Sequence, residues 1–190
     1  VRILESAIHD ASQAIASHSA GKDEEEGMGA TCACAWVIEN RLYTAYVGDS
    51  RIYLLRGKQI QRLTVDHTWV QEEYKKGIIT AEQMRDHPNV HVIRRYLGGI
   101  KLPDVDFRLR IDNEESKEES ENNQGFHLEP GDTILLCTDG LTDLVWDNEI
   151  LKIIRSKKDM KQAAESLINL ANDRGGHDNI TVVIMSMPRL

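Results

Sequence analysis

The sequence has 190 residues, of which 41% are hydrophobic and 28% charged, a composition typical of a globular domain with a sizeable core. Its 23 Lys and Arg against 31 Asp and Glu give a formal net charge of −8, which argues against nucleic acid as the main partner. We expect neither a membrane span nor a signal peptide, because there is no long apolar run and no basic flank before an apolar stretch. The three cysteines give no disulfide framework, which predicts reduced thiols and a cytoplasmic protein.

The first half of the chain predicts one helix followed by short antiparallel strands. Apolar residues recur with a helical period over residues 1–18, which indicates an amphipathic helix. Short apolar segments separated by tight turns then predict a meander of strands over residues 31–38, 42–47, 51–55 and 60–63. Thr68 can cap a further helix, and Thr80 with Gln83 can form a capping box for another. We therefore expect a small helical excursion within residues 66–98.

The second half adds an acidic segment and further strands and helices. Residues 112–121 hold six acids against one Lys, and no apolar side chain occurs before Gly125, so we expect an acidic flexible loop over residues 112–125. The other predicted elements are strands over residues 105–111, 133–137 and 180–187 and helices over residues 147–155 and 163–171. Because strands follow strands and helices follow helices, the pattern indicates an α+β fold with a mostly antiparallel sheet.

Four aspartates lie near predicted strand ends. Asp49 and Asp139 each follow a strand, Asp178 precedes the last strand, and Asp143 follows Asp139 by four residues. If a helix or turn starts at Gly140, the carboxylates of Asp139 and Asp143 point the same way. Four carboxylates with no well-placed Cys or His suit a hard cation such as Mg2+ or Mn2+. Each aspartate taken alone is more simply explained as a turn residue.

Two other features have a functional and a structural interpretation. Asp66 and His67 are either a catalytic acid–base pair or, more simply, part of a structural turn. The three tryptophans are spread along the sequence and form no stacking platform, which again disfavours nucleic-acid binding.

Five segments, in this order along the chain, resemble motifs of the metal-dependent protein phosphatases of the PPM or type-2C family. They are Gly29-Ala30-Thr31, Val47-Gly48-Asp49-Ser50-Arg51, Thr64-x-Asp66-His67-Thr68, Cys137-Thr138-Asp139-Gly140-Leu141-x-Asp143 and His177-Asp178-Asn179-Ile180-Thr181-Val182. The likeness extends over residues 3–187, and residues 66–98 are similar to the flap subdomain of bacterial members. It implies an antiparallel β-sandwich flanked by helices in α-β-β-α layers, with residues 1–190 forming a single phosphatase-like domain.

The resemblance also implies an activity and a set of metal ligands. Members of this family hydrolyse phosphoserine and phosphothreonine in proteins with a water activated by Mn2+ or Mg2+. By resemblance, Asp139 and Asp178 bind one of the two principal ions, and Asp49, Asp139 and Asp143 belong to a third, weaker site. The resemblance further implies phosphorylated proteins as substrates and a Ser/Thr kinase pathway as the signalling context.

The sequence departs from the family pattern in what precedes these motifs. The family's phosphate-binding Arg, its Glu-Asp pair and its Asp-Gly-x-Gly-Gly metal motif do not occur, and Gly27-Met28-Gly29 is no substitute because Glu26 precedes it. We therefore expect the N-terminal strands to be missing, the catalytic residues to lie outside these residues, and this chain alone to be inactive. A non-catalytic phosphatase-like regulatory or binding domain is the main alternative, and an unrelated Mg2+-dependent hydrolase is a weaker one. A sheet edge left uncovered would favour self-association.

Overall fold

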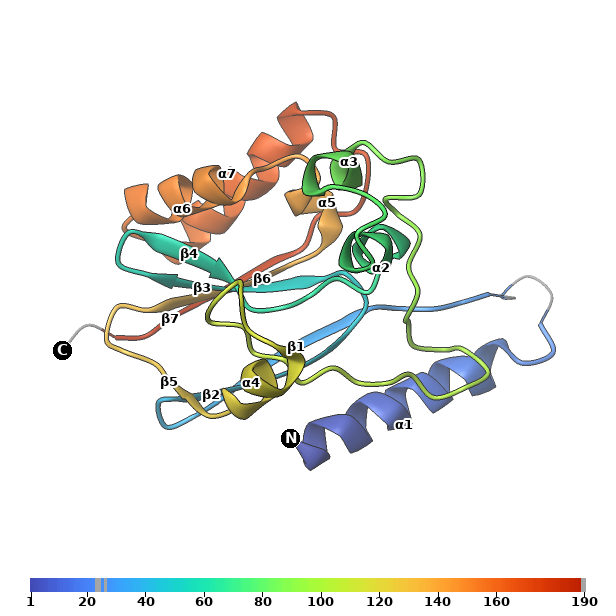
Figure 1. The fold of residues 1–190 in the computed structure, drawn as a ribbon. Coiled ribbons are helices and arrows are strands. Elements are labelled where there is room, and N and C mark those ends of the chain that lie inside the picture. Colours follow the sequence, from blue (N-terminus) through green and yellow to red (C-terminus); the bar gives the residue numbers. More distant parts are fainter. Residues whose placement is uncertain (23–24, 26, 189–190) are drawn as a thin grey trace. The chain divides into compact units, whose positions relative to one another are not determined.

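The computed structural model (Figure 1) describes residues 1–22, 25 and 27–188. The chain forms two compact units. The first unit comprises Val1–Cys34, Thr44–Asp49 and Val65–Phe107, and the second comprises Ala35–Tyr43, Ser50–Thr64 and Arg108–Leu190. The strands β1 (Cys32–Ile38) and β2 (Arg41–Val47) therefore contribute residues to both units.

The first unit has a core made by its N-terminal helix and the inner ends of the hairpin strands. The predicted first helix is confirmed as α1 (Arg2–Ser19). The buried residues of this core are Ile8, Ala45, Val47, Leu97 and Val105. Ile8 comes from α1, and its neighbours Leu4 and Ile15 pack against the same cluster, as expected for one face of an amphipathic helix.

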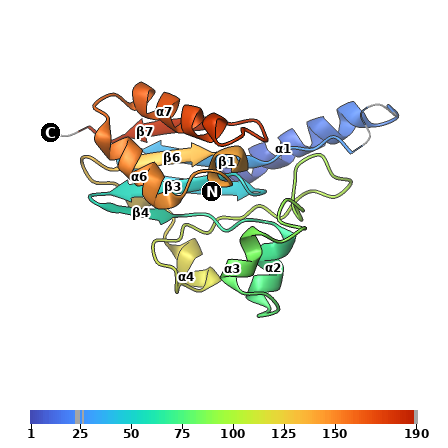
Figure 2. The same ribbon diagram turned by 90° about the horizontal axis from the view of Figure 1, so that it is seen from above.

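The two short helices predicted within residues 66–98 also belong to the first unit. They are α2 (Trp69–Lys75) and α3 (Ala81–Arg85), which lie side by side in Figures 1 and 2. The Thr68 side chain accepts from the Gln71 N–H, and Thr80 with Gln83 forms the expected capping box.

The second unit is built on an antiparallel sheet with the strand order β4-β3-β6-β7. Its strands are β3 (Arg51–Arg56), β4 (Gln59–Arg62), β6 (Thr133–Cys137) and β7 (Val182–Ser186). In the other sheet, of order β1-β2-β5, the pairing of β2 with β5 (Phe126–His127) is also antiparallel. The predicted mixture of helices with antiparallel sheets is therefore confirmed.

Two helices cover one face of the four-stranded sheet. Figures 1 and 2 show α6 (Asp147–Ser156) and α7 (Met160–Asp173) packed on that face, within the second unit. The buried core between them includes Tyr53, Leu135, Ile150 and Leu167. The short helix α5 (Asp139–Thr142) begins directly after β6 and extends this core with Leu141.

The strand predicted over residues 105–111 is wrong. Asp106 makes only an isolated bridge with Tyr46, while Leu109 N–H donates to Ser120 and Arg110 N–H donates to Leu63. Since successive backbone groups find partners on different segments, no continuous ladder forms. Residues 105, 106, 108 and 109 are all buried, so the apolar alternation does not correspond to one buried and one exposed face.

The acidic segment over residues 112–125 differs from the expected loop. It contains the helix α4 (Lys117–Asn122), which starts with a capping box between Ser116 and Glu119. Hydrogen bonds to the Glu119 carboxylate lower the pKa of this group and help to keep it charged at the helix N-terminus. Ser120 is fully buried and donates to the Ser116 and Lys117 carbonyls, so polar contacts rather than apolar burial order this helix.

An ion pair holds the start of α6 to the end of α7. Both terminal nitrogens of the Arg174 guanidinium donate to the Glu149 carboxylate, at 2.8 and 2.7 Å. Arg174 also donates to the Leu144 carbonyl, and Glu149 accepts from the Trp146 N–H. These bonds, chiefly those from Arg174, lower the pKa of Glu149 to about 2.

We expect this pair to contribute to acid stability. The pKa of Glu149 is lowered from 4.5 to about 2 on folding, so its contribution is present above pH 4.5 and is lost as the pH falls toward 2. The difference in urea unfolding between the protein and Glu149→Gln should therefore be full at pH 6 and shrink steadily as the pH falls from 4.5 toward 2. Glu165→Gln, on the exposed surface of α7, is the control and should show no such pH-dependent difference. A Glu149→Gln effect that is constant across this pH range would contradict the prediction.

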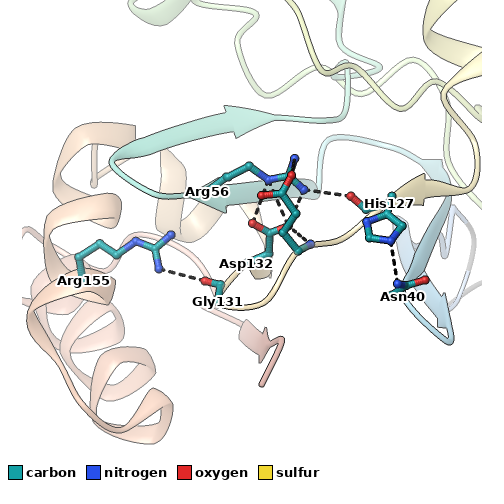
Figure 3. Close-up of polar contacts among 7 residues, drawn as sticks. Asn40, Arg56, His127, Gly131, Asp132 and Arg155 are labelled. Carbon is teal, nitrogen blue, oxygen red and sulfur yellow. Dashed lines mark hydrogen bonds and ion pairs between the residues drawn. The ribbon is translucent and has the colours of Figure 1, made fainter. Parts of the chain in front are cut away.

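A second ion pair lies at the turn before β6 (Figure 3). The Arg56 guanidinium donates to both carboxylate oxygens of Asp132, which is almost fully buried, and also to the His127 carbonyl. The Asp132 carboxylate accepts a further bond from the Glu129 N–H. The negative charge of Asp132 is therefore compensated by Arg56 at the end of β3.

Cys32, Cys34 and Cys137 are all free thiols, and burial raises the pKa of Cys32 and Cys34, which favours their protonated form. Among the residues described, no helix has the length and hydrophobicity needed to cross a bilayer.

Candidate functional site

Two of the four candidate aspartates lie together at the end of β6. Asp139 is the first residue of α5, and the Asp143 N–H donates to its carbonyl at 2.8 Å, closing a helical turn. One carboxylate oxygen of each residue lies within 4.8 Å of the other. The side chain of Asp139 is fixed by Gly140, whose backbone N–H donates to Asp139 Oδ1 at 2.9 Å. The chain thus brings two acidic side chains together on one side of a short helix.

The segment that carries Asp178 is tied to the start of α5. Thr138 Oγ1 donates to the Asn179 carbonyl at 3.1 Å and accepts from the Thr181 N–H at 3.0 Å. A backbone bond from Thr138 N–H to the Thr181 carbonyl completes the connection. Asp178 itself is exposed, and its Oδ1 accepts from the Asn179 N–H at 2.7 Å. Asp139 and Asp178 therefore lie on two chain segments held directly against each other.

Gly140 is the residue that allows these two segments to approach. A Cβ at this position would lie 2.5 Å from the Asn179 carbonyl oxygen and 3.4 Å from that of Asp178. Real Cβ atoms are not found so close to a backbone oxygen, so no other residue fits without a shift of the backbone. The Asp-Gly pair, which the sequence alone explains as a turn, is required here by packing.

Asp49 lies in the first unit, at the end of β2, and is 7% exposed. The backbone next to Asp49 is held by a buried hydrogen-bond network of Gly48, His67 and Asp106. The Gly48 N–H donates to His67 Nδ1 at 3.0 Å, so the proton of this imidazole is on Nε2, which donates to Asp106 at 3.0 Å. His67 N–H also donates to the Gly48 carbonyl, and the Tyr46 ring stacks on the imidazole with centroids 5.3 Å apart.

The four carboxylates are candidate ligands from the sequence, but the contacts that position them were not predicted. The contacts of His67 favour its structural interpretation, since both ring nitrogens are used in holding buried groups. Its partner Asp106 was counted only as part of a strand. Thr138 belongs to one of the motif segments, but its link to the Asp178 segment was not predicted because it depends on residues more than forty positions later. The one available signal was an isolated acid, Asp106, between apolar residues.

The donor set of the second unit fits a hard divalent cation. Asp139 and Asp178 each use one carboxylate oxygen to accept a neighbouring backbone N–H, and within the described part of the chain this leaves the second oxygen available. Asp143 adds a third carboxylate close to Asp139. Carboxylate oxygens are the ligands that Mg2+ and Mn2+ prefer, and a cation would offset the repulsion between these charges.

The fold and these acidic side chains define an α+β protein with a candidate divalent-metal site at the end of an antiparallel sheet. Two family models match the chain: "Protein phosphatase 2C" over residues 2–83 and "Stage II sporulation protein E (SpoIIE)" over residues 115–188. Protein phosphatase PhpP of Streptococcus pneumoniae is 37% identical over 171 residues, which cover 90% of this chain and 63% of that protein. This chain therefore spans less than two thirds of that relative's length.

Solved structures give the same family. The serine/threonine phosphatase PstP/Ppp of Mycobacterium tuberculosis matches with a TM-score of 0.77 and 34% identity, over 94% of this chain and 68% of that one. A structure of the catalytic domain of PstP in complex with two manganese ions matches with a TM-score of 0.76 and 34% identity, over 95% of this chain and 68% of that one. The chain belongs to the protein phosphatase 2C, or PPM, family.

Proposed function

We propose that the protein to which this chain belongs removes phosphate from phosphoserine and phosphothreonine in cytoplasmic proteins. The observation that supports this most directly is the pair Asp139 and Asp178, held on adjacent segments by Thr138 at motif positions of the family. We further propose Asp49, Asp139, Asp143 and Asp178 as ligands of Mn2+ or Mg2+. The relatives' names as serine/threonine phosphatases support the proposed activity, and the manganese complex of PstP supports Mn2+ as the cation.

The residues of this chain have a supporting role in the proposed reaction. Bound divalent ions would activate water and neutralise charge on the phosphoryl group. Asp139 and Asp178 orient one carboxylate oxygen each through backbone N–H groups, which reduces the reorganisation needed to bind a cation. His67 fixes the backbone of Gly48, and this also positions the next residue, Asp49.

The finer parts of the proposal concern this chain by itself. We propose that residues 1–190 act as part of one phosphatase domain, with residues 66–98 as its flap, and that the chain alone is inactive. Its sequence has no Asp-Gly-x-Gly-Gly motif. A Ser/Thr kinase is its proposed signalling counterpart. A non-catalytic binding domain is the alternative.

Self-association of the chain through a sheet edge is also proposed. β4 and β7 are the edge strands of the second unit's sheet, and the exposed Val183 on β7 supports self-association through such an edge.

We expect phosphatase activity to require an upstream segment together with these aspartates. With Mn2+, a longer protein carrying that segment should hydrolyse p-nitrophenyl phosphate and a phosphothreonine peptide, whereas the 190-residue chain should not. Asp139→Asn or Asp178→Asn should lower the activity of the longer protein by about 100-fold or more. Asp173→Asn, at the exposed end of α7, is the matched control and should keep full activity.

The opposite results would separate the alternatives. A longer protein with no turnover but intact fold would favour the non-catalytic binding domain. Robust turnover by the 190-residue chain, lost in Asp139→Asn, would overturn the proposed incompleteness of this chain. Turnover of the longer protein that is independent of both aspartates would overturn their assignment as ligands.

A further inference from the structure

The second unit contains a basic pocket that is separate from the candidate metal site. The pocket has a volume of about 480 Å³ and lies between the end of α6, the start of α7 and the adjoining ends of β6 and β7. It is lined by Gly131, Thr133, Ile154, Arg155, Lys157, Lys158, Met160, Ser186 and Met187. Thr133 begins β6 and Asp139 follows its other end, so the strand's rise of roughly 14 Å separates the two regions.

The Arg155 side chain is the unusual feature of this pocket. Its Nε and Nη2 atoms are covered from solvent and have no hydrogen-bond partner within the part of the chain that the structure describes. Among the described residues, the guanidinium makes one bond, from Nη1 to the Gly131 carbonyl, at the long distance of 3.5 Å (Figure 3). A covered cationic donor without a partner is costly and rare in native proteins, so it calls for an explanation.

The nearby acidic groups do not supply that partner. The Asp132 carboxylate, next in sequence to Gly131, is occupied by Arg56 and the Glu129 N–H, as Figure 3 shows for Arg56. The Glu129 carboxylate also pairs with Arg56. The Asp159 carboxylate accepts from the Lys161 N–H at the start of α7 through one oxygen, and its charge offsets only part of the three cations of the pocket. Asp132 and Glu129 are thus paired with Arg56, and the pocket keeps a net positive charge from Arg155, Lys157 and Lys158 against Asp159.

The remaining lining groups fit an anion with an apolar body. Lys157 and Lys158 add two exposed cations at the end of α6. The hydroxyls of Thr133 and Ser186 lie 3.1 Å apart, and since one proton serves the bond between them, the other can be donated to a ligand. Ile154, Met160 and Met187 supply the apolar lining.

We propose that this pocket binds the phosphate group of a small phosphomonoester. A planar guanidinium matches the geometry of phosphate oxygens, and a phosphate that carries close to two negative charges balances three cations better than a single carboxylate does. Because Nε and Nη2 are covered from solvent, their contact with the phosphate requires the side chains around Arg155 to move on binding. The apolar lining accommodates an ester group on the phosphate. Free inorganic phosphate offers the same phosphate chemistry but lacks the apolar ester group.

The test is to titrate the protein separately with phenyl phosphate, inorganic phosphate and phenol. Binding is measured by calorimetry and by the change in the melting temperature of the protein. EDTA and constant ionic strength remove binding to metal ions and general salt effects. We expect saturable binding of phenyl phosphate, weaker binding of inorganic phosphate and none of phenol. Equal affinity for the two phosphates would assign the site to free phosphate, whereas no saturable binding of either would overturn the proposal.

Three variants connect the binding to the pocket. Arg155→Met should weaken phenyl phosphate binding by about tenfold or more, since it removes a charge-assisted contact. It should not lower the melting temperature of the free protein, because it also removes the partnerless donors. The double variant Lys157→Met, Lys158→Met should also weaken binding. Lys152→Met, an exposed charge on α6 outside the pocket, is the matched control. Wild-type affinity in Arg155→Met, or an equal loss in Lys152→Met, would overturn the proposal.

Discussion

Replacing His67 with alanine is expected to lower the free energy of unfolding by about 3 kcal/mol or more. The imidazole is 5% exposed and bonds to the Gly48 N–H and the Asp106 carboxylate, which is also buried. The substitution removes both bonds and leaves a cavity where the ring stacked on Tyr46. For a protein of this size, the expected fall in melting temperature is about 10 °C.

Two further measurements separate this role from general packing. Amide hydrogen exchange at Gly48 should become faster in His67→Ala, because its N–H loses its acceptor. His67→Asn, whose side-chain oxygen can lie near the position of Nδ1, should recover part of that protection. His18→Ala, at an exposed histidine on α1, should change stability by less than about 0.5 kcal/mol. Unchanged exchange at Gly48 in His67→Ala would show that the imidazole does not hold this turn.

Much of the fold could be predicted because its signals are local. The strands β1 to β3 are short, mostly apolar segments between turns, and α2 and α3 begin at capping residues that the sequence displays. The strand expected over residues 105–111 failed for the opposite reason. Its apolar period of two was present, but whether a strand forms depends on a neighbouring strand offering a continuous ladder, which a sequence pattern does not report.

The acidic segment shows a different limit. Its composition correctly excluded an apolar core, but α4 is ordered by the Ser116 capping box and by polar bonds of the buried Ser120. The bond from Leu109 N–H to the Ser120 carbonyl ties the helix to a distant segment. Low hydrophobicity therefore did not imply the absence of structure, because tertiary hydrogen bonds stabilise this helix.

The candidate site was predictable at the level of residue type and less so in its geometry. The spacing of Asp139 and Asp143 correctly placed their carboxylates together, because that contact lies within one helical turn. The contact of Asp178 with the start of α5 depends on Thr138 and on the absence of a side chain at Gly140. Neither requirement can be predicted from the sequence unless the position of the last strand beside β6 is known.

Gly140→Ala is expected to weaken Mn2+ binding by about 10–100-fold, comparable to the loss of a group that orients a metal ligand. The added Cβ would lie 2.5 Å from the Asn179 carbonyl oxygen, and a backbone atom cannot move aside as a flexible side chain can. The segment that carries Asp178 must therefore shift away from Asp139, which separates two proposed ligands. Overpacking of this kind also costs about 1–3 kcal/mol of stability.

Gly99→Ala is the matched control for this prediction. A Cβ at Gly99 would meet its nearest atoms at 3.6 Å, an ordinary contact, so the same chemical change should leave metal binding intact. Calorimetric titration with Mn2+ and thermal unfolding would be measured for both variants in the longer protein. If the substitution separates the ligands, Gly140→Ala should bind Mn2+ more weakly even at temperatures well below its melting temperature, where the protein is folded. Wild-type affinity in a destabilised Gly140→Ala would show that the close approach serves packing and not the metal site.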